Sequence, residues 1–195
     1  MPASTTQTSI ANRGLQILGY PAITSIGQPG DRGAKAMNRA YQPVHLSELQ
    51  KNYWHFATLR AQLAASATAP LHSKAYAYPL PNDYIMLAPE DQFGNYPEKK
   101  DWIIESGHII TDDQAPLKIR YISSAVTEAM FDAIYAEALS AALAVATGEE
   151  LTQSNTKVER AMQIYLEQIN LARKRGSILT PKARLPVSPW ISMRG

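Results

Sequence analysis

The residues best suited to chemistry in this sequence are its histidines, because the chain contains no cysteine. There are four, His45, His55, His72 and His108. A metal site on one helix face needs two ligands three or four residues apart, and no two of these histidines have that spacing. His55 lies between Trp54 and Phe56, so we expect it to pack against these rings rather than to bind a metal. The lack of cysteine excludes disulfides, thiolate metal sites and a cysteine nucleophile.

Adjacent carboxylates occur at Glu90-Asp91, Asp112-Asp113 and Glu149-Glu150. Each pair lies beside a turn signal, where neighbouring acids are usually solvated rather than paired for acid–base catalysis. Asp112-Asp113 could bind a cation, but no third ligand is indicated. The glycine-rich residues 27–33 lack the Lys-Ser/Thr of a phosphate-binding loop, and no Gly-x-Ser-x-Gly elbow occurs. The sequence therefore predicts no catalytic residue, no metal site and no cofactor.

Positive charge is concentrated at the C-terminal end. The net charge is only +2, yet residues 173–195 contain six bases and no acid, which leaves the rest of the chain with a net charge of −4. A basic end of this kind is either a solvated segment or an arm that docks on an acidic partner or a nucleic acid. No helix-turn-helix or zinc module is visible, so we expect no sequence-specific DNA binding.

The hydrophobic pattern is that of a soluble protein. Apolar residues make up 45% of the chain, which is typical of a globular domain. Residues 1–8 are polar and precede no signal region, and the apolar stretch 133–146 contains Glu137 and is too short to cross a bilayer. We therefore expect a protein made in the cytoplasm without a membrane partner.

Helical periodicity appears in four segments. Apolar residues recur at spacings of three and four in residues 7–18, 32–53, 128–147 and 155–174. Asp31 and Thr127 are expected to cap the second and third helices, since their side chains can accept free N–H groups. Gly19, Gly148 and Gly176 are expected to end helices one, three and four. Pro43 predicts a kink or break in the second helix. On the last helix the expected buried stripe is Val158, Met162, Tyr165, Ile169 and Ala172.

Between the second and third helices, residues 54–122 consist of short apolar runs separated by proline and glycine. Lys118 and Arg120 alternate with apolar neighbours, which is the period of a half-buried strand. Ser106-Gly107 is typical of a hairpin turn. The sequence predicts a mainly α protein of the α+β class, in which a bundle of about four helices carries a small antiparallel β-sheet between helix 2 and helix 3. Residues 1–175 form the domain, and residues 176–195 form a basic, proline-containing tail.

Several short motifs follow one another in a characteristic order. Asn38-Arg39-Ala40-Tyr41 precedes Pro43, and Trp54-His55-Phe56-Ala57 follows the second helix. Leu80-Pro81-Asn82-Asp83-Tyr84 comes next, before the apolar runs 102–111 and 117–122. Together they resemble the tail tubular protein A family, the head-to-tail adaptors (connectors) of short-tailed bacteriophages. The resemblance covers about residues 10–175.

The resemblance implies a ring of 12 copies, with the portal protein above it and the tail nozzle below. Genomic DNA passes through the central channel of such a ring during ejection, without sequence-specific binding. On this resemblance we expect a structural virion protein of the phage tail or neck, which is made in the host cytoplasm and is not an enzyme. Its partners are copies of itself, the portal protein and the nozzle or another downstream tail protein.

The basic tail suggests one docking hypothesis. We expect it to dock on an acidic surface of the portal or nozzle, with Trp190 as the anchor, because tryptophan commonly fills pockets at interfaces. Truncation after Lys174 should then abolish assembly and leave the fold intact, and normal particles would refute the idea. The residues expected to dock are Arg173, Lys174, Arg175, Lys182, Arg184 and Trp190.

Two other functions stay open. One is a neck or adaptor protein of a long-tailed phage, which electron microscopy of the source particle separates from the first. The other is a cytoplasmic enzyme with a cryptic site, which a pocket bringing histidine and carboxylates together would favour.

Overall fold

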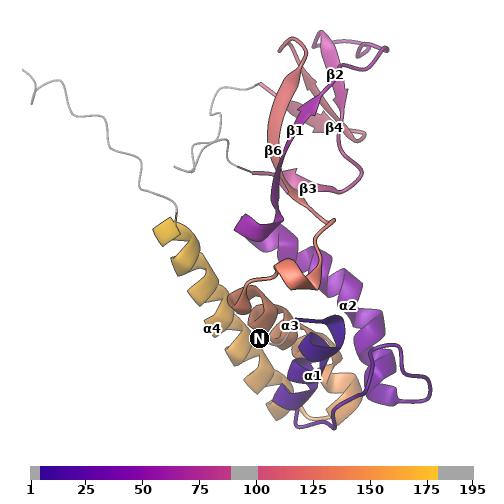
Figure 1. Ribbon diagram of the computed structural model, residues 1–195, viewed down its shortest axis with the longest axis vertical. Coiled ribbons are helices and arrows are strands. Elements are labelled where there is room, and N and C mark those ends of the chain that lie inside the picture. Colours follow the sequence, from indigo (N-terminus) through magenta and orange to yellow (C-terminus); the bar gives the residue numbers. More distant parts are fainter. Residues whose placement is uncertain (1–4, 89–100, 180–195) are drawn as a thin grey trace, which may run out of the picture.

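The computed structural model describes residues 5–88 and 101–179. Figure 1 shows the helices gathered at one end of the molecule and the strands at the other. The helices are α1 (Gln7–Ile17), α2 (Arg32–Lys51), α3 (Ala133–Thr152) and α4 (Asn155–Leu179). The strands are β1 (Thr58–Leu63), β2 (Tyr76–Pro79), β3 (Tyr84–Leu87), β4 (Ile103–Glu105), β5 (His108–Thr111) and β6 (Leu117–Ser123). The predicted α+β class is confirmed, with four helices and an antiparallel β-region between α2 and α3.

The first two helices begin where side chains satisfy free backbone N–H groups. The Thr6 hydroxyl accepts a hydrogen bond from the N–H of Ser9 at 3.1 Å, and the Ser9 hydroxyl accepts one from the N–H of Thr6 at 2.9 Å. Asp31, the expected cap of α2, accepts from the N–H of Ala34 at 2.8 Å. After α1, Gly19 adopts a φ of +61°, which glycine tolerates without strain. The predicted starts and ends near these residues are confirmed.

Two expected boundaries of α3 are wrong. The helix begins after Asp132, whose carboxylate accepts from the N–H of Tyr135 at 2.7 Å, whereas Thr127 precedes a separate 3-10 turn, Glu128–Met130. Gly148 lies inside α3 instead of ending it. A Cβ at Gly148 would lie 2.9 Å from the Val158 side chain, so this glycine allows α4 to approach α3 closely.

Neither Pro43 nor Gly176 interrupts its helix. α2 runs through Pro43 without a break, although proline removes one backbone hydrogen bond. α4 continues through Gly176 to Leu179, so the expected helix end at that glycine is wrong. Regular structure therefore extends past the expected boundary between domain and tail.

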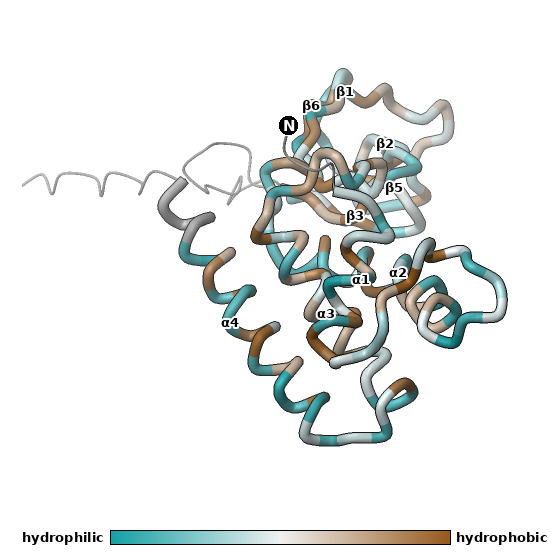
Figure 2. The backbone as a smooth tube through the Cα atoms, turned by 60° about the horizontal axis from the view of Figure 1, so that its bottom comes forward, coloured by the Kyte–Doolittle hydropathy of each residue, from teal (hydrophilic) through white to brown (hydrophobic). Residues whose placement is uncertain are grey.

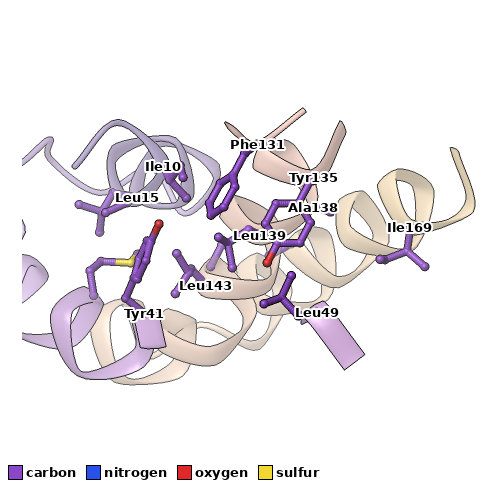
Figure 3. Packing of buried hydrophobic residues seen from close by; sticks show 14 of the residues in the cluster. Ile10, Leu15, Tyr41, Leu49, Phe131, Tyr135, Ala138, Leu139, Leu143 and Ile169 are labelled. Atoms are coloured by element: carbon purple, nitrogen blue, oxygen red, sulfur yellow. The ribbon is translucent and has the colours of Figure 1, made fainter. Parts of the chain in front are cut away.

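The main core lies where α1 and α2 pack on α3. Figure 3 shows Leu15 of α1, Tyr41 of α2 and Leu143 of α3 directed into the space between these helices. A Cβ at Gly14 would lie 2.8 Å from the backbone oxygen of Ser140. The backbones of α1 and α3 therefore meet at a distance that only glycine permits.

The β-region contains two three-stranded sheets, where the sequence predicted one. Their strand orders are β1-β6-β3 (sheet A) and β2-β5-β4 (sheet B), and every pairing is antiparallel. The predicted hairpin between β4 and β5 is confirmed, since Ser106 and Gly107 both have positive φ angles as a tight hairpin turn requires. The buried side chains that the two sheets share form a second core of Leu63, Tyr78, Ile109, Leu117, Ile119 and Tyr121.

Candidate interaction surface

An apolar groove runs across the helical part between α2 and α4. Its floor is α3, which contributes Ala142, Val145 and Ala146. Its walls include Pro43 and Val44 from α2 and Met162 and Tyr165 from α4, and its volume is about 320 Å³. We call this the α2–α4 groove. The groove forms because α2 and α4 both pack on α3 but have little backbone contact with each other.

The α2–α4 groove ends in a polar cluster of Glu48, Lys51 and Tyr165. Glu48 is only 1% exposed, and its carboxylate accepts a hydrogen bond from the Lys51 ammonium at 2.6 Å. The Tyr165 hydroxyl donates to the same carboxylate at 3.2 Å and accepts from Lys51 at 3.0 Å. Burial by itself would lower the pKa of Lys51, but the hydrogen bonds to Glu48 and Tyr165 and the charge of Glu48 raise it above its usual value. The cluster ties α2 to α4, and the other described residues that line the groove are apolar except for Ser47.

α4 exposes large apolar side chains beside its buried stripe. Met162 is 43% exposed and Leu166 51% exposed, and their four-residue spacing places them on one flank of the helix. Leu171 is 49% exposed and lies on the opposite flank. The expectation that Met162 belongs to the buried stripe is therefore wrong, and Ala161 takes its place. Figure 2 shows α4 at the edge of the helical part with apolar stretches along its length.

A buried aromatic cluster joins the helices to the β-region. The Tyr135 hydroxyl of α3 lies 2.7 Å from Nδ1 of His45 on α2. The Tyr135 ring also meets Trp54, Phe56 and Phe131 at centroid distances of 4.7, 4.9 and 4.8 Å. Burial raises the pKa of Tyr135 far above its usual value. Burial lowers the pKa of His45, and the nearby charge of Glu128 offsets only part of that effect.

The lowered pKa of His45 predicts a loss of stability in mild acid. Below about pH 6.5 the unfolded chain takes up a proton at His45 that the folded protein resists until its own, lower pKa is reached. The unfolded state then binds more protons, so the free energy of unfolding falls as the pH falls through this window. We expect His45→Gln to reduce the change in urea midpoint between about pH 7.5 and about pH 5.5.

The matched control is His55→Gln, which changes an exposed histidine. It should retain the pH dependence of the original protein. If His45→Gln and His55→Gln show the same dependence, His45 is not the group responsible.

The prediction that His55 packs against its aromatic neighbours is wrong. His55 is exposed, because the 3-10 turn His55–Ala57 directs Trp54 and Phe56 toward the core and His55 away from it. His45 is the buried histidine, at 4% exposure. The α2–α4 groove has a carboxylate among its described lining residues but no histidine.

Two of the three acidic pairs, Asp112-Asp113 and Glu149-Glu150, have members that take part in contacts within the chain. The side chain of Asp112 accepts from Lys74 and from the N–H of Ala75, both at 3.0 Å, and these bonds lower its pKa. Asp113 accepts from the Trp102 indole N–H at 2.8 Å. Glu150 pairs with Arg39, and Glu90-Asp91 lies outside the described residues. Within residues 5–88 and 101–179, no group of three or more acids and histidines could hold a metal ion.

The residues expected to dock on a partner are only partly described. Arg173 and Lys174 are exposed on the last turns of α4. Arg175 belongs to α4, but its side chain lies outside the described part, as do Lys182, Arg184 and Trp190. The docking hypothesis for the tail therefore stays a prediction.

Comparison with known proteins adds no relative to this description. No family model and no curated protein matches the chain. In the part of the chain that the structure describes, no helix is long and apolar enough to cross a membrane.

Proposed function

We propose that this protein is a structural subunit of a bacteriophage particle, a head-to-tail adaptor that stacks as a ring beneath the portal. The order of its sequence motifs resembles that of the tail tubular protein A family. The observed order of elements, a helical part with a β-region inserted between α2 and α3, is compatible with what the resemblance implies. In this role the chain works through surfaces that fit neighbouring subunits.

The observation that best supports the proposal is the apolar flank of α4 next to an apolar groove. Met162 and Leu166 are close to half exposed, and Met162 also lines the α2–α4 groove. Contiguous apolar surface of this kind commonly marks a protein interface. α4 lies at one side of the helical part, and α2 with the loop before it lies at the other (Figure 1). A subunit that offers different surfaces on its two sides forms head-to-tail contacts, which close into a ring when the rotation permits.

The proposal is tested by analytical ultracentrifugation of the purified protein, alone and mixed with the portal protein of the same phage. We expect the isolated chain to sediment as a monomer and the mixture to contain a larger ring-bearing complex. Failure of the two proteins to associate would overturn the adaptor role. Electron microscopy of the source particle distinguishes the short-tailed adaptor from the neck protein of a long-tailed phage.

A further inference from the structure

The α2–α4 groove has the size and polarity to hold one large apolar side chain. Its volume is about 320 Å³, at the lower end of the range of about 300–1000 Å³ for pockets that hold a small molecule. The charges at its end are already matched within the chain, since Glu48 accepts hydrogen bonds from Lys51 and Tyr165. The groove therefore offers apolar contact to an occupant and leaves no charge for it to neutralise.

The groove opens onto the apolar flank of α4. Met162 lines the groove and is 43% exposed, and Leu166, one turn further along the helix, is 51% exposed. Exposure of this size means that no described segment packs over the flank. Contiguous apolar surface commonly binds another protein segment, so the groove and the flank together form a site for an apolar stretch of chain.

The sequence that follows α4 has the composition to fill this site. Residues 185–191 read Leu-Pro-Val-Ser-Pro-Trp-Ile and contain no charge. Two prolines in so short a segment reduce the conformational entropy that binding costs. Trp190 has the largest apolar surface in the segment, and tryptophan commonly anchors a chain in a pocket. The sequence thus provides an apolar segment with one bulky anchor.

The length of this segment matches the way back to the groove. Met162 lies 17 residues before Leu179, the last residue of α4, which corresponds to about 25 Å along the helix. Residues 183–190 also span about 25 Å when a proline-containing segment is extended. Residues 180–182 remain for the reversal of direction at the end of α4. Trp190 can therefore reach the groove beside Met162 of its own chain.

The distribution of charge favours the same arrangement. Residues 180–195 contain three bases and no acid. Glu149 of α3 and Glu159 of α4 are exposed one turn beyond the groove lining, near the connection between the two helices. Neither forms an ion pair with another described residue. Arg194 follows Trp190 by four residues, so a segment that runs along the groove brings this base toward the two acids.

We propose that in the free chain residues 183–190 fold back along α4, with Trp190 in the α2–α4 groove beside Met162. The occupant comes from the same chain because a short tether holds it at an effective concentration of about a millimolar. The inference rests on the proposed function and deepens it, since the docked segment covers the flank that we propose for ring contact. Docking of the tail on the portal or nozzle would withdraw Trp190 and open that flank.

The test uses the absence of cysteine from the chain, because two introduced cysteines can pair only with each other. In the extended segment Ser188 lies about 6 Å before Trp190, level with Leu166. On mild oxidation of the full chain, Leu166→Cys/Ser188→Cys should form its disulfide on the order of 10-fold faster than Leu171→Cys/Ser188→Cys. Leu171 is exposed to the same degree on the opposite flank. A free tether would favour Leu171, which is nearer to Ser188 in sequence.

Non-reducing electrophoresis of dilute protein measures the two rates. Adding Trp190→Ser to both variants should make the rates equal, because the segment then lacks its anchor. Equal rates before that change, or a fast Leu166–Ser188 disulfide that survives it, would overturn the inference. Disulfide-linked dimers in place of monomers would also overturn it, since they would assign the segment to the groove of a second copy.

A second measurement tests whether the docked segment covers the ring contact. At a concentration at which the original isolated chain sediments as a monomer, Trp190→Ser should form larger species. A variant that stays monomeric would overturn this role of the segment. The disulfide rates are measured without the portal protein, so they do not depend on the adaptor role. Failure to associate with the portal protein would overturn that role alone and leave the docked segment in place.

Discussion

Replacing Tyr135 with alanine is expected to lower the free energy of unfolding by about 3–5 kcal/mol, as truncation of a buried aromatic ring commonly does. The Tyr135 side chain is fully buried and packs against the rings of Trp54, Phe56 and Phe131. Domains of this size are stable by only about 5–15 kcal/mol. The variant should therefore unfold at a much lower urea concentration, measured by circular dichroism at neutral pH.

The size of this effect follows from where Tyr135 lies. Trp54 and Phe56 belong to the segment that leads from α2 into β1, and Phe131 belongs to the segment that leads from β6 into α3. Tyr135 therefore packs against both connections between the helices and the β-region. A cavity at this position would loosen both connections as well as the helix core.

The conservative variant Tyr135→Phe separates the hydrogen bond from the packing. It keeps the ring but leaves Nδ1 of buried His45 without the hydroxyl at 2.7 Å. An unsatisfied buried polar group costs about 1–3 kcal/mol, so this variant should lie between the original protein and Tyr135→Ala. If the phenylalanine and alanine variants lose the same stability, the ring contacts are not the main contribution.

The fold was largely predictable because local signals agree with the tertiary structure in most elements. Asp31 is followed directly by an apolar helical pattern, and the start of α2 was predicted correctly. Ser106-Gly107 separates two short β-type runs, and the turn between β4 and β5 was also predicted correctly. The predicted helix end at Gly148 was wrong, because the sequence does not distinguish a glycine that ends a helix from a glycine that allows two helices to pack closely. Only the position of Val158 against α3 distinguishes the two.

Other features depend on tertiary contacts that no local pattern contains. Asp132 rather than Thr127 caps α3, although both residue types accept N–H groups. Alternation predicted β6 as a strand, but it could not predict which strands pair, and so it gave one sheet where there are two.

The same limit applies to the surfaces proposed for function. The α2–α4 groove could not be predicted, because its lining residues come from three helices whose relative placement no local pattern contains. The exposed flank of α4 was missed because periodicity defines an apolar stripe without fixing its centre. The way α4 rests on α3 decides that Ala161 is buried and Met162 half exposed.

The double variant Met162→Glu/Leu166→Glu is expected to abolish ring assembly while the monomer remains folded. Both side chains are close to half exposed in the single chain, and exposed positions usually change stability by no more than about 0.5 kcal/mol. Inside a subunit contact, each substitution would instead bury a carboxylate in an apolar environment, which is costly unless the charge is paired. A loss of about 3 kcal/mol at each contact weakens pairwise association on the order of 100-fold.

The chain offers a matched control for this flank in Leu171→Glu. Leu171 is exposed to the same degree on the same helix but lies on its opposite flank. Sedimentation with the portal protein should therefore show rings for Leu171→Glu and free monomer for the double variant, with equal thermal midpoints for the isolated proteins. Assembly that survives Met162→Glu/Leu166→Glu and fails with Leu171→Glu would move the subunit contact to the other flank of α4. Assembly that survives both changes would remove α4 from the contact, because a buried glutamate cannot be neutral to an apolar interface on either flank.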